Sequence, residues 1–364
     1  MLSRISHCFR RRVPKVYAAK HCRYDKTLFN LLKTRSFEVR IIFLAVSILF
    51  STSALAAVIV TDQNFARAET DLYFRQQVER APVNQFDHNR DSVNVENQMI
   101  IRSNTDLLYS TAVVDVSGGA TFKLAKGEAF QIMHIFNNDH DNHVAIYGGE
   151  ELYLDTEKAG TDYVYILMRT AVTAGMEEAH RLQDAAVVDA KSAKPFVESA
   201  DWDDESRDKI RAKWEKLVNT IKTEEAFTAG ITATPDNEQF MIGTAVGWAG
   251  MPAEHAVYAS RAGNGSLECA VVTFQPPYLQ YDKGGYWSLT AYSGTGWLMS
   301  NKNSIDSTTA SLNPDGTVTI GFNCDKTANN IEVTEKDWNF AVRAYRPADI
   351  EKAVGQMHAF PEVP

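Results

Sequence analysis

One stretch near the C-terminus decides the fold class of this chain: GGYWSLTAYSGTGWLMSNKNSIDSTTASLNPDGTVTIGFN, from Gly284 to Asn323. Short runs rich in aromatic and β-branched residues alternate there with turns rich in Gly, Asn and Asp, which is typical of β-strands. The tetrapeptide NPDG, Asn313–Gly316, predicts a hairpin turn, because Pro fixes φ and Gly accepts a positive φ. A further strand-like segment, DWNFAVRAYRP, runs from Asp337 to Pro347. The C-terminal part is therefore predicted to be antiparallel β-structure.

The N-terminal half also has the pattern of β-structure. A short amphipathic start, with Phe65, Ala68 and Leu72 on one helical face, precedes a region from Gln98 to Arg169 that is rich in Val, Ile, Tyr and Phe. Its apolar runs LLYSTAVVDV, FQIMHIF and YVYILMR are bounded by Gly, Asn and Asp, which predicts strands separated by turns.

Between the two β-regions, residues 171–227 change to a helical period. Met176–Val188 predicts one helix with Leu182 facing inward, and Asp203 or Asp204 is a plausible N-cap for a second helix. The apolar residues of the second helix share one face: Ile210, Trp214, Leu217, Val218 and Ile221. We expect these helices to form a packed connector.

Five ordered motifs link both halves of the chain to one family. They are NQFDHNR at Asn84–Arg90, RSNTDLLYS at Arg102–Ser110, AVVD at Ala112–Asp115, NNDH at Asn137–His140 and GTAVGWAGMP at Gly243–Pro252. With the C-terminal stretch, they resemble a two-domain bacterial envelope family of unknown biochemistry, DUF1254 followed by DUF1214. The family usually has GWGGLP in the last motif, so Ala249 and Met251 are mild departures.

The resemblance implies a jelly roll at the C-terminus. The expected fold is mainly β with a helical insert: an N-terminal β-sandwich plus a C-terminal jelly-roll-like β-sandwich. The expected organisation is a basic leader with a signal peptide at 1–57, a DUF1254-like domain at 58–170, a helical connector at 171–227 and a DUF1214-like domain at 228–364.

The leader predicts export. Residues 41–60 are nearly all apolar or small, and the forty residues before them hold eleven Lys or Arg against two acidic residues. Small residues around Ala56 and Ala57 fit a signal-peptidase site, so we expect a periplasmic or secreted protein. An uncleaved signal anchor is the alternative, and it is the only expected contact with a membrane. A mitochondrial presequence is a further, weaker alternative.

Charge excludes one class of partner. The whole chain has 37 basic and 46 acidic residues, and without the leader 26 and 44 remain, a net charge of −18. Such a surface repels phosphate backbones, so we expect no nucleic-acid partner.

Only two cysteines follow the leader, Cys269 and Cys324, both in strand-like segments. In an oxidising compartment they can form a disulfide if their strands are neighbours. Two buried free thiols are the alternative.

No established catalytic motif is present, so the sequence does not decide whether the protein is an enzyme. Polar residues cluster in two of the family motifs, where Arg102, Asn104 and Asp106 share a face if their segment is a strand. The ligand-binding candidates are Asn84, His88, Arg90, Arg102, Asn104, Asp106, Tyr109 and Trp248. The alternative is a buried polar network that only specifies the fold.

A third cluster, in the sequence NNDHDNH, contains weak metal candidates: Asp139, His140 and His143. The alternative is a polar surface loop between strands, with His134 as a core histidine, and we expect neither a metal nor a cofactor.

These features predict a protein that binds a small polar or carbohydrate-like ligand. The alternative is an exported hydrolase or lyase, with His88 or His140 as general base and Arg102 or Arg90 holding an anion.

Overall fold

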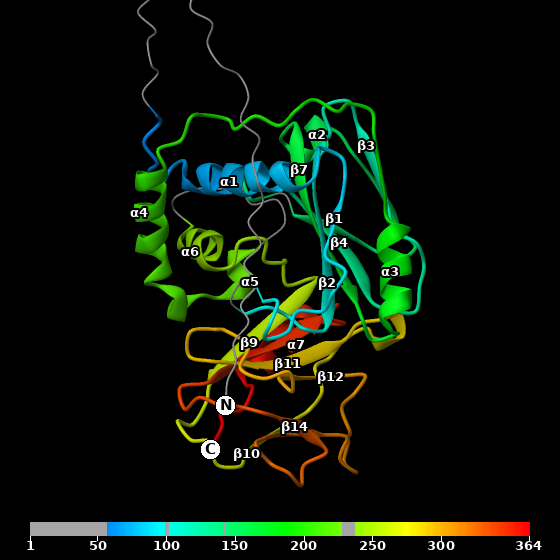
Figure 1. Cartoon of the computed structure of the whole chain (residues 1–364), viewed down its shortest axis with the longest axis vertical. Helices are drawn as coiled ribbons and strands as arrows, with labels where there is room; N and C mark the ends of the chain where they lie inside the picture. Colours follow the sequence, from blue (N-terminus) through cyan, green and yellow to red (C-terminus); the bar gives the residue numbers. More distant parts are fainter. Residues whose placement is uncertain (1–56, 99–101, 142, 228–236) are drawn as a thin grey trace, which may run out of the picture. The chain divides into compact units, whose positions relative to one another are not determined.

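Two antiparallel sheets pack face to face in the N-terminal half of the computed structural model, which describes residues 57–98, 102–141, 143–227 and 237–364 (Figure 1). The larger sheet has the order β1 (Asp87–His88), β2 (Leu107–Asp115), β7 (Tyr163–Ala171), β4 (Gln131–Asn137) and β5 (Val144–Tyr147). The smaller sheet has the order β6 (Glu151–Leu154), β3 (Ala120–Lys123) and β8 (Val187–Ala190). The predicted leader and its cleavage site at Ala56 lie outside the described residues.

Alternation along β4 assigns its side chains to two different environments. Met133 and Ile135 pack into the core between the two sheets, where Phe122 of β3 also lies. His134 and Phe136 alternate with them and so face the opposite side. Every residue of β4 is buried, because both faces of the larger sheet are covered.

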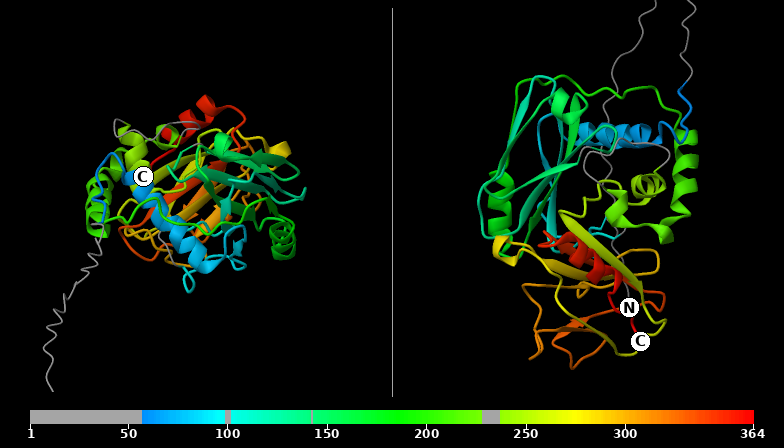
Figure 2. Two further views of the ribbon diagram at one scale, coloured as in Figure 1. Left: turned by 90° about the horizontal axis from the view of Figure 1, so that it is seen from above. Right: turned by 180° about the vertical axis from the view of Figure 1, so that it is seen from behind.

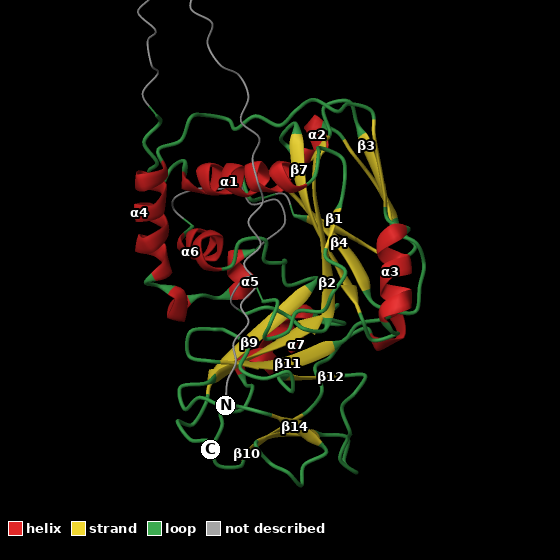
Figure 3. Cartoon of the chain, in the orientation of Figure 1, coloured by secondary structure: helices red, strands yellow, loops and turns green. Residues whose placement is uncertain are grey.

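A group of helices lies on that opposite side of the larger sheet (Figures 2 and 3). They are α1 (Phe65–Arg80), α4 (Asp204–Glu215), η1 (Val218–Thr220), α5 (Thr223–Ala226) and α6 (Glu238–Val246). Of these, α1 lies against β2 and α4 lies on the outside. Phe65, Trp214 and Phe240 join three of them in one apolar cluster. The short helix α2 (Thr156–Ala159) precedes β7, and α3 (Met176–Asp184) follows it.

The helices of residues 171–227 are shorter than the sequence predicts. The Asp203 side chain accepts a hydrogen bond from the Ser206 amide at 2.8 Å, which confirms it as the N-cap of α4. The helix ends at Glu215, before the predicted face is complete, because the next residues include Val, Asn and Thr, which are weak helix formers. The other helix ends at Asp184, since the following residues form β8 and pair with β3.

The C-terminal half forms the second sandwich. One sheet has the order β12 (Ser304–Asp306), β11 (Trp287–Tyr292), β15 (Asn339–Tyr345) and β9 (Ala256–Ala262). The other has the order β10 (Ala270–Phe274), β13 (Val318–Phe322) and β14 (Asn329–Ile331). The chain passes between the sheets from β9 to β10, β10 to β11, β12 to β13 and β14 to β15. The short helix η2 (Tyr281–Lys283) precedes β11, and α7 (Ile350–His358) follows β15. The NPDG turn is confirmed: Gly316 has φ +81°, and the Asn313 amide donates to the Thr317 carbonyl at 2.8 Å.

A disulfide joins Cys269 and Cys324. These residues flank the neighbouring strands β10 and β13, where Ala270 pairs with Phe322. The structure therefore selects the disulfide over the two free thiols that the sequence also allowed.

The predicted fold class is confirmed: the chain is mainly β, with an N-terminal sandwich, a helical insert and a C-terminal jelly-roll-like sandwich. The described residues form one compact unit, in which an apolar cluster with Leu107, Phe130, Tyr286 and Tyr345 joins the two sandwiches. In the described part of the chain, no helix is long and apolar enough to span a membrane.

Candidate functional site

The two sandwiches meet at a polar surface that we call the junction site, made of Tyr109, Arg169, Tyr258, Arg343 and Tyr345. Strand alternation explains its origin in the C-terminal sandwich. The even-numbered residues of β15, from Phe340 to Ala344, enter the core, so Arg343 and Tyr345 point out of the core, toward the N-terminal sandwich.

Each sandwich contributes one tyrosine and arginine pair to the junction site. Tyr109 of β2 is paired directly with Arg169 of β7, and Tyr258 of β9 is paired with Arg343 of β15. The two pairs are close in space, because the charges of both arginines act on the Tyr258 phenol. Tyr109 and Tyr258 are partly exposed, whereas Tyr345 is buried.

Both arginines are nearly buried, with 8% of each residue exposed. Arg343 donates to the Arg102 carbonyl at 2.7 Å and lies over the Tyr292 ring, while Arg169 donates to the Ala249 carbonyl at 3.2 Å. Within the described residues, neither arginine forms an ion pair with a carboxylate, and Nη1 of Arg169 has no hydrogen-bond partner. Buried cations without an anion are rare, because removing a charge from water costs several kcal/mol.

Protonation keeps the junction site positive at neutral pH. Burial raises the pKa of Tyr258 and Tyr345, so both remain neutral phenols. Burial alone would lower the pKa of Arg343, but the neighbouring oxygens of Tyr292 and Tyr345 raise it, and the net direction is upward. Arg343 is therefore a cation, and Asp106 is a carboxyl whose pKa its charge lowers.

Asp106 lies beside the junction site and offsets only part of its positive charge. Burial, together with the charge of Asp306, raises its pKa to about 6. One of its oxygens accepts from the Ser304 hydroxyl at 3.0 Å, and Oδ2 has no partner among the described residues. A single carboxyl of this kind balances at most one of the two guanidinium groups.

Asn104 also reaches the junction site, although not from a strand. Its side chain donates to the Tyr345 hydroxyl at 3.2 Å and accepts from the Asp106 amide at 2.9 Å. The expected strand through Arg102, Asn104 and Asp106 is absent, because β2 begins at Leu107 and Arg102 has φ +56°. The Arg102 side chain is exposed and donates to Asn339 Oδ1 at 3.0 Å.

Asn84, His88 and Arg90 lie elsewhere and make contacts that hold the fold together. The Asn84 side chain accepts from the Asp115 amide at 2.9 Å and donates to the Ser192 carbonyl at 2.8 Å. His88 Nδ1 contacts the Ser110 hydroxyl at 2.8 Å, and burial lowers the pKa of His88. Arg90 pairs with an aspartate of α3, Asp184. Arg90 thus joins the segment after β1 to α3, while Asn84 and His88 contact residues of β2 and of the segment after β8.

The NNDHDNH segment is not the surface loop that the sequence suggested as one reading. His140 is 0% exposed and His143 2% exposed, because α1 and α6 cover this end of the larger sheet. The core position of His134 is as predicted. Asp139 is engaged by Arg67 in an ion pair of 2.6 Å, and the described residues contain no cluster of three or more metal ligands.

Hydrogen bonds link the three histidines. His134 Nε2 lies 2.8 Å from His143 Nδ1, and His143 Nε2 lies 2.8 Å from the His140 carbonyl oxygen. His140 Nε2 accepts from the Ala249 amide at 2.9 Å, and its Nδ1 contacts Thr244 Oγ1 at 3.0 Å. Both ring nitrogens of His140 are therefore used within the fold, which leaves none to accept a proton from a substrate.

Trp248 packs beside this histidine cluster. Its ring stacks on His140 and, at a centroid distance of 4.1 Å, on Tyr73 of α1, while its Nε1 donates to Thr70 Oγ1 at 3.1 Å. The next residue, Ala249, connects the two regions, because its amide donates to His140 and its carbonyl accepts from Arg169. Ala249 has φ +63°, where glycine is favoured.

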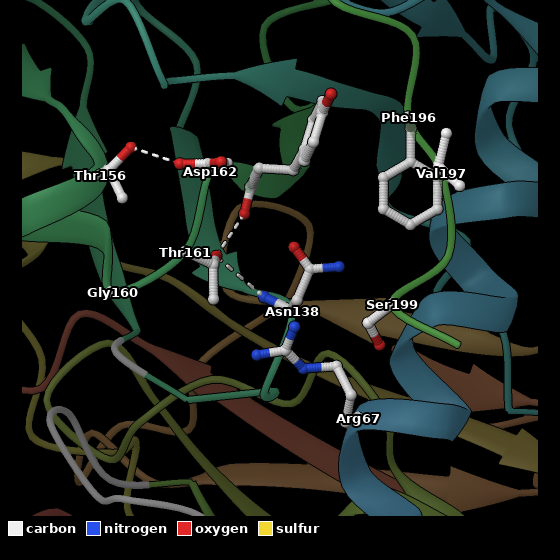
Figure 4. A pocket seen from close by; sticks show the side chains of 10 residues that line it. Arg67, Asn138, Thr156, Gly160, Thr161, Asp162, Phe196, Val197 and Ser199 are labelled. Atoms are coloured by element: carbon white, nitrogen blue, oxygen red, sulfur yellow. Dashed lines mark hydrogen bonds between the residues drawn. The ribbon is translucent and has the colours of Figure 1, made fainter. Parts of the chain in front are cut away.

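A separate pocket of about 380 Å³ opens beside the N-terminal turns of α1 (Figure 4). Most of its polar side chains are paired with one another or with neighbouring groups. Arg67 binds Asp139 through two nitrogens, Thr156 donates to Asp162, and Asn138 donates to the buried Asp71. This pocket has space but few free polar groups, whereas the junction site has unpaired charges.

The sequence reading missed Arg169, Tyr258, Arg343 and Tyr345. A signal was available for the two arginines, since each interrupts an apolar strand segment, YVYILMRTA and NFAVRAY. A charged residue is seldom buried in such a segment unless it is paired.

Residues 262–349 match the model of DUF1214, a family described as proteins of unknown function. The VPA0106 protein of Vibrio parahaemolyticus has a similar structure, with a TM-score of 0.61 at 15% identity over 80% of this chain and 95% of that one. An uncharacterised Burkholderia cenocepacia protein aligns with a TM-score of 0.45 at 13% identity over 79% and 85% of the two chains. No curated protein matches. The C-terminal sandwich thus matches DUF1214, and the first of these structures shares the fold of the chain.

Proposed function

We propose that the protein binds a small organic anion at the junction site, with its carboxylate groups held by Arg169 and Arg343. One observation carries this proposal: two nearly buried guanidinium groups face the same junction without an ion-paired carboxylate among the described residues. An anion would compensate both charges, and arginine suits carboxylates because its planar fork donates two parallel hydrogen bonds.

The tyrosines fit the same ligand class. As neutral phenols, Tyr258 and Tyr345 can donate to ligand oxygens, and their rings provide apolar walls. A small polar ligand with two acidic groups, such as a dicarboxylate, matches two arginines contributed by two different sheets.

Binding suits this geometry better than hydrolysis. A general base needs a free lone pair near the reacting group. His140 has none, and the raised pKa values of the tyrosines disfavour phenolates at neutral pH. His88 is bonded to Ser110. Ser110 follows Tyr109 along β2, so its side chain points to the opposite face of the sheet from the junction site.

We further propose that this binding takes place outside the cytoplasm. The basic leader and its small-residue cleavage site support export. The Cys269–Cys324 disulfide supports it independently, since such bonds persist mainly in oxidising compartments. N-terminal sequencing of the purified periplasmic protein should find Ala57 or Val58 first, and an intact leader in the membrane fraction would argue for an anchor.

The experiment that tests binding is calorimetric titration with succinate, acetate and inorganic phosphate. We expect succinate to bind the wild-type protein and to raise its Tm, while Arg169→Gln weakens binding at least tenfold. The matched control is Arg181→Gln, which removes an exposed arginine paired with Glu178 and should bind like wild type. Equal binding by all three proteins, or by none, would reject the site.

The stability of Arg169→Gln without any ligand is a second test of the site. Arg169→Gln removes a buried charge that has no ion-pair partner, so its Tm should stay the same or rise. A loss of several kcal/mol in the free energy of unfolding would instead assign Arg169 to the scaffold.

A further inference from the structure

His134 presents a second unpaired group next to Arg169. Its Nδ1 atom is buried, the residue is 0% exposed, and this nitrogen has no hydrogen-bond partner among the described residues. Arg169 Nη1, the unpaired donor of the junction site, is in the same condition.

The hydrogen bonds of the histidine cluster determine what His134 Nδ1 can do. A carbonyl oxygen only accepts, so His143 Nε2 must carry the proton that it donates to the His140 carbonyl. A neutral His143 then has a lone pair on Nδ1, and His134 Nε2 must donate to it. A neutral His134 therefore has its remaining lone pair on Nδ1, which makes that atom a hydrogen-bond acceptor.

The register of the larger sheet places this acceptor beside the donor. Ile132 of β4 is paired with Arg169, and His134 is paired with Leu167 two residues along β7. His134 and Arg169 are thus diagonal neighbours on one face, which is within reach of long side chains. The charge of Arg169 also acts on the His134 ring.

We infer that the ligand is a hydroxy acid: its carboxylate binds Arg169, and its neighbouring hydroxyl donates to His134 Nδ1. This inference rests on the proposed anion site. A hydroxyl on the carbon next to a carboxylate supplies an acceptor and a donor at one end of a small molecule, as the two unpaired atoms require. An ammonium group in the same position would also donate, but the Arg169 charge would repel it. The class is therefore a hydroxydicarboxylate rather than an amino acid.

The test compares malate with succinate, which differ by one hydroxyl. We expect one enantiomer of malate to bind the wild-type protein about tenfold more tightly than succinate, because its hydroxyl fills a buried acceptor. The readout is the ratio of the two dissociation constants, measured by calorimetry on the full mature protein.

Two substitutions of His134 separate its two nitrogens. In His134→Gln the side-chain amide can occupy the position of Nε2 and keep the donor to His143, but no atom replaces Nδ1. We expect the ratio to fall to about one. In His134→Asn an oxygen can occupy the position of Nδ1, so the ratio should stay well above one. Arg181→Gln is the control, and it should reproduce the wild-type ratio.

Each outcome decides a different point. If neither acid binds the wild-type protein, the anion site itself is rejected. If both bind equally, or if His134→Gln keeps the preference for malate, the anion site stands and the hydroxy-acid inference is overturned, with water as the occupant of the acceptor position.

Discussion

At the scale of single residues, Asp106 is a buried carboxyl beside the junction site whose pKa is raised toward neutrality. Its pKa is raised from 3.8 to about 6, first by burial and then by Asp306. The folded protein therefore holds this proton more tightly than the unfolded chain does. The stabilising effect is complete below pH 4 and is lost as the pH rises through 6.

Asp106→Asn should remove this dependence. A shift from 3.8 to about 6 corresponds to roughly 3 kcal/mol of unfolding free energy. We expect the variant to gain that much relative to wild type between pH 4 and pH 7, while its side-chain oxygen still accepts from Ser304. Denaturant titrations across this range provide the difference curve. Parallel curves for the two proteins would show that folding does not change the pKa of Asp106.

The buried histidines change the stability in the opposite direction: they make the folded protein less stable as the pH falls. Burial lowers the pKa of His134 and His140 well below 6.5, and lowers that of His143 to about 4. Nearby charges from His255 and, for His134, from Arg169 act the same way. The unfolded chain then binds more protons than the folded one below pH 6.5, so stability falls as the pH falls.

His143→Gln should make the free energy of unfolding depend less steeply on pH in acid, by the uptake of about one proton. For His143 alone, the expected cost between pH 7 and pH 4 is about 3 kcal/mol. The variant lacks this titration, so its free energy of unfolding should decrease less over that range, even if it starts lower. An unchanged slope would mean that the pKa of His143 is the same in the folded and the unfolded protein.

Sequence reasoning located some of these residues and missed others. It selected Asn104, Asp106 and Tyr109 because they crowd one motif, and these residues do lie at or beside the junction site. It could not select Arg169 and Arg343, because their proximity depends on how two sheets pack. It also selected Asn84, His88 and Arg90, which lie away from the junction site and contact Ser192, Ser110 and Asp184.

Strands were easier to predict than helix boundaries. The apolar runs that became β2, β4 and β7 are long and are bounded by clear turn residues. The ends of α3 and α4 depend on what the chain does next, since β8 takes its place beside β3 only in the folded molecule. The burial of the NNDHDNH segment was likewise set by the helices above it, which its own composition does not reveal.

The disulfide supplies a prediction for the C-terminal sandwich. Cys269 and Cys324 are separated by 55 residues. Closing a loop of this size should contribute about 4 kcal/mol by restricting the unfolded chain. We expect Cys269→Ala with Cys324→Ala, or treatment with reductant, to lower the Tm by roughly 10 °C. A Tm unaffected by reductant, with two alkylatable thiols in the untreated unfolded protein, would contradict the bond.

The whole molecule places its unpaired charges where its two sandwiches meet. The larger N-terminal sheet supplies Arg169 and His134, and the outer face of β15 supplies Arg343. Neither sandwich contains the junction site alone, so the anion binding that we propose requires both halves. The match to DUF1214 covers only the second half, from residue 262 to residue 349.

A crystal structure of the mature protein grown with succinate would show directly whether the junction site binds an anion. We predict a carboxylate within hydrogen-bond distance of Arg169 Nη1, and a second carboxylate at Arg343. Density for succinate only on the outer surface, with water between the two arginines, would contradict anion binding at the junction site.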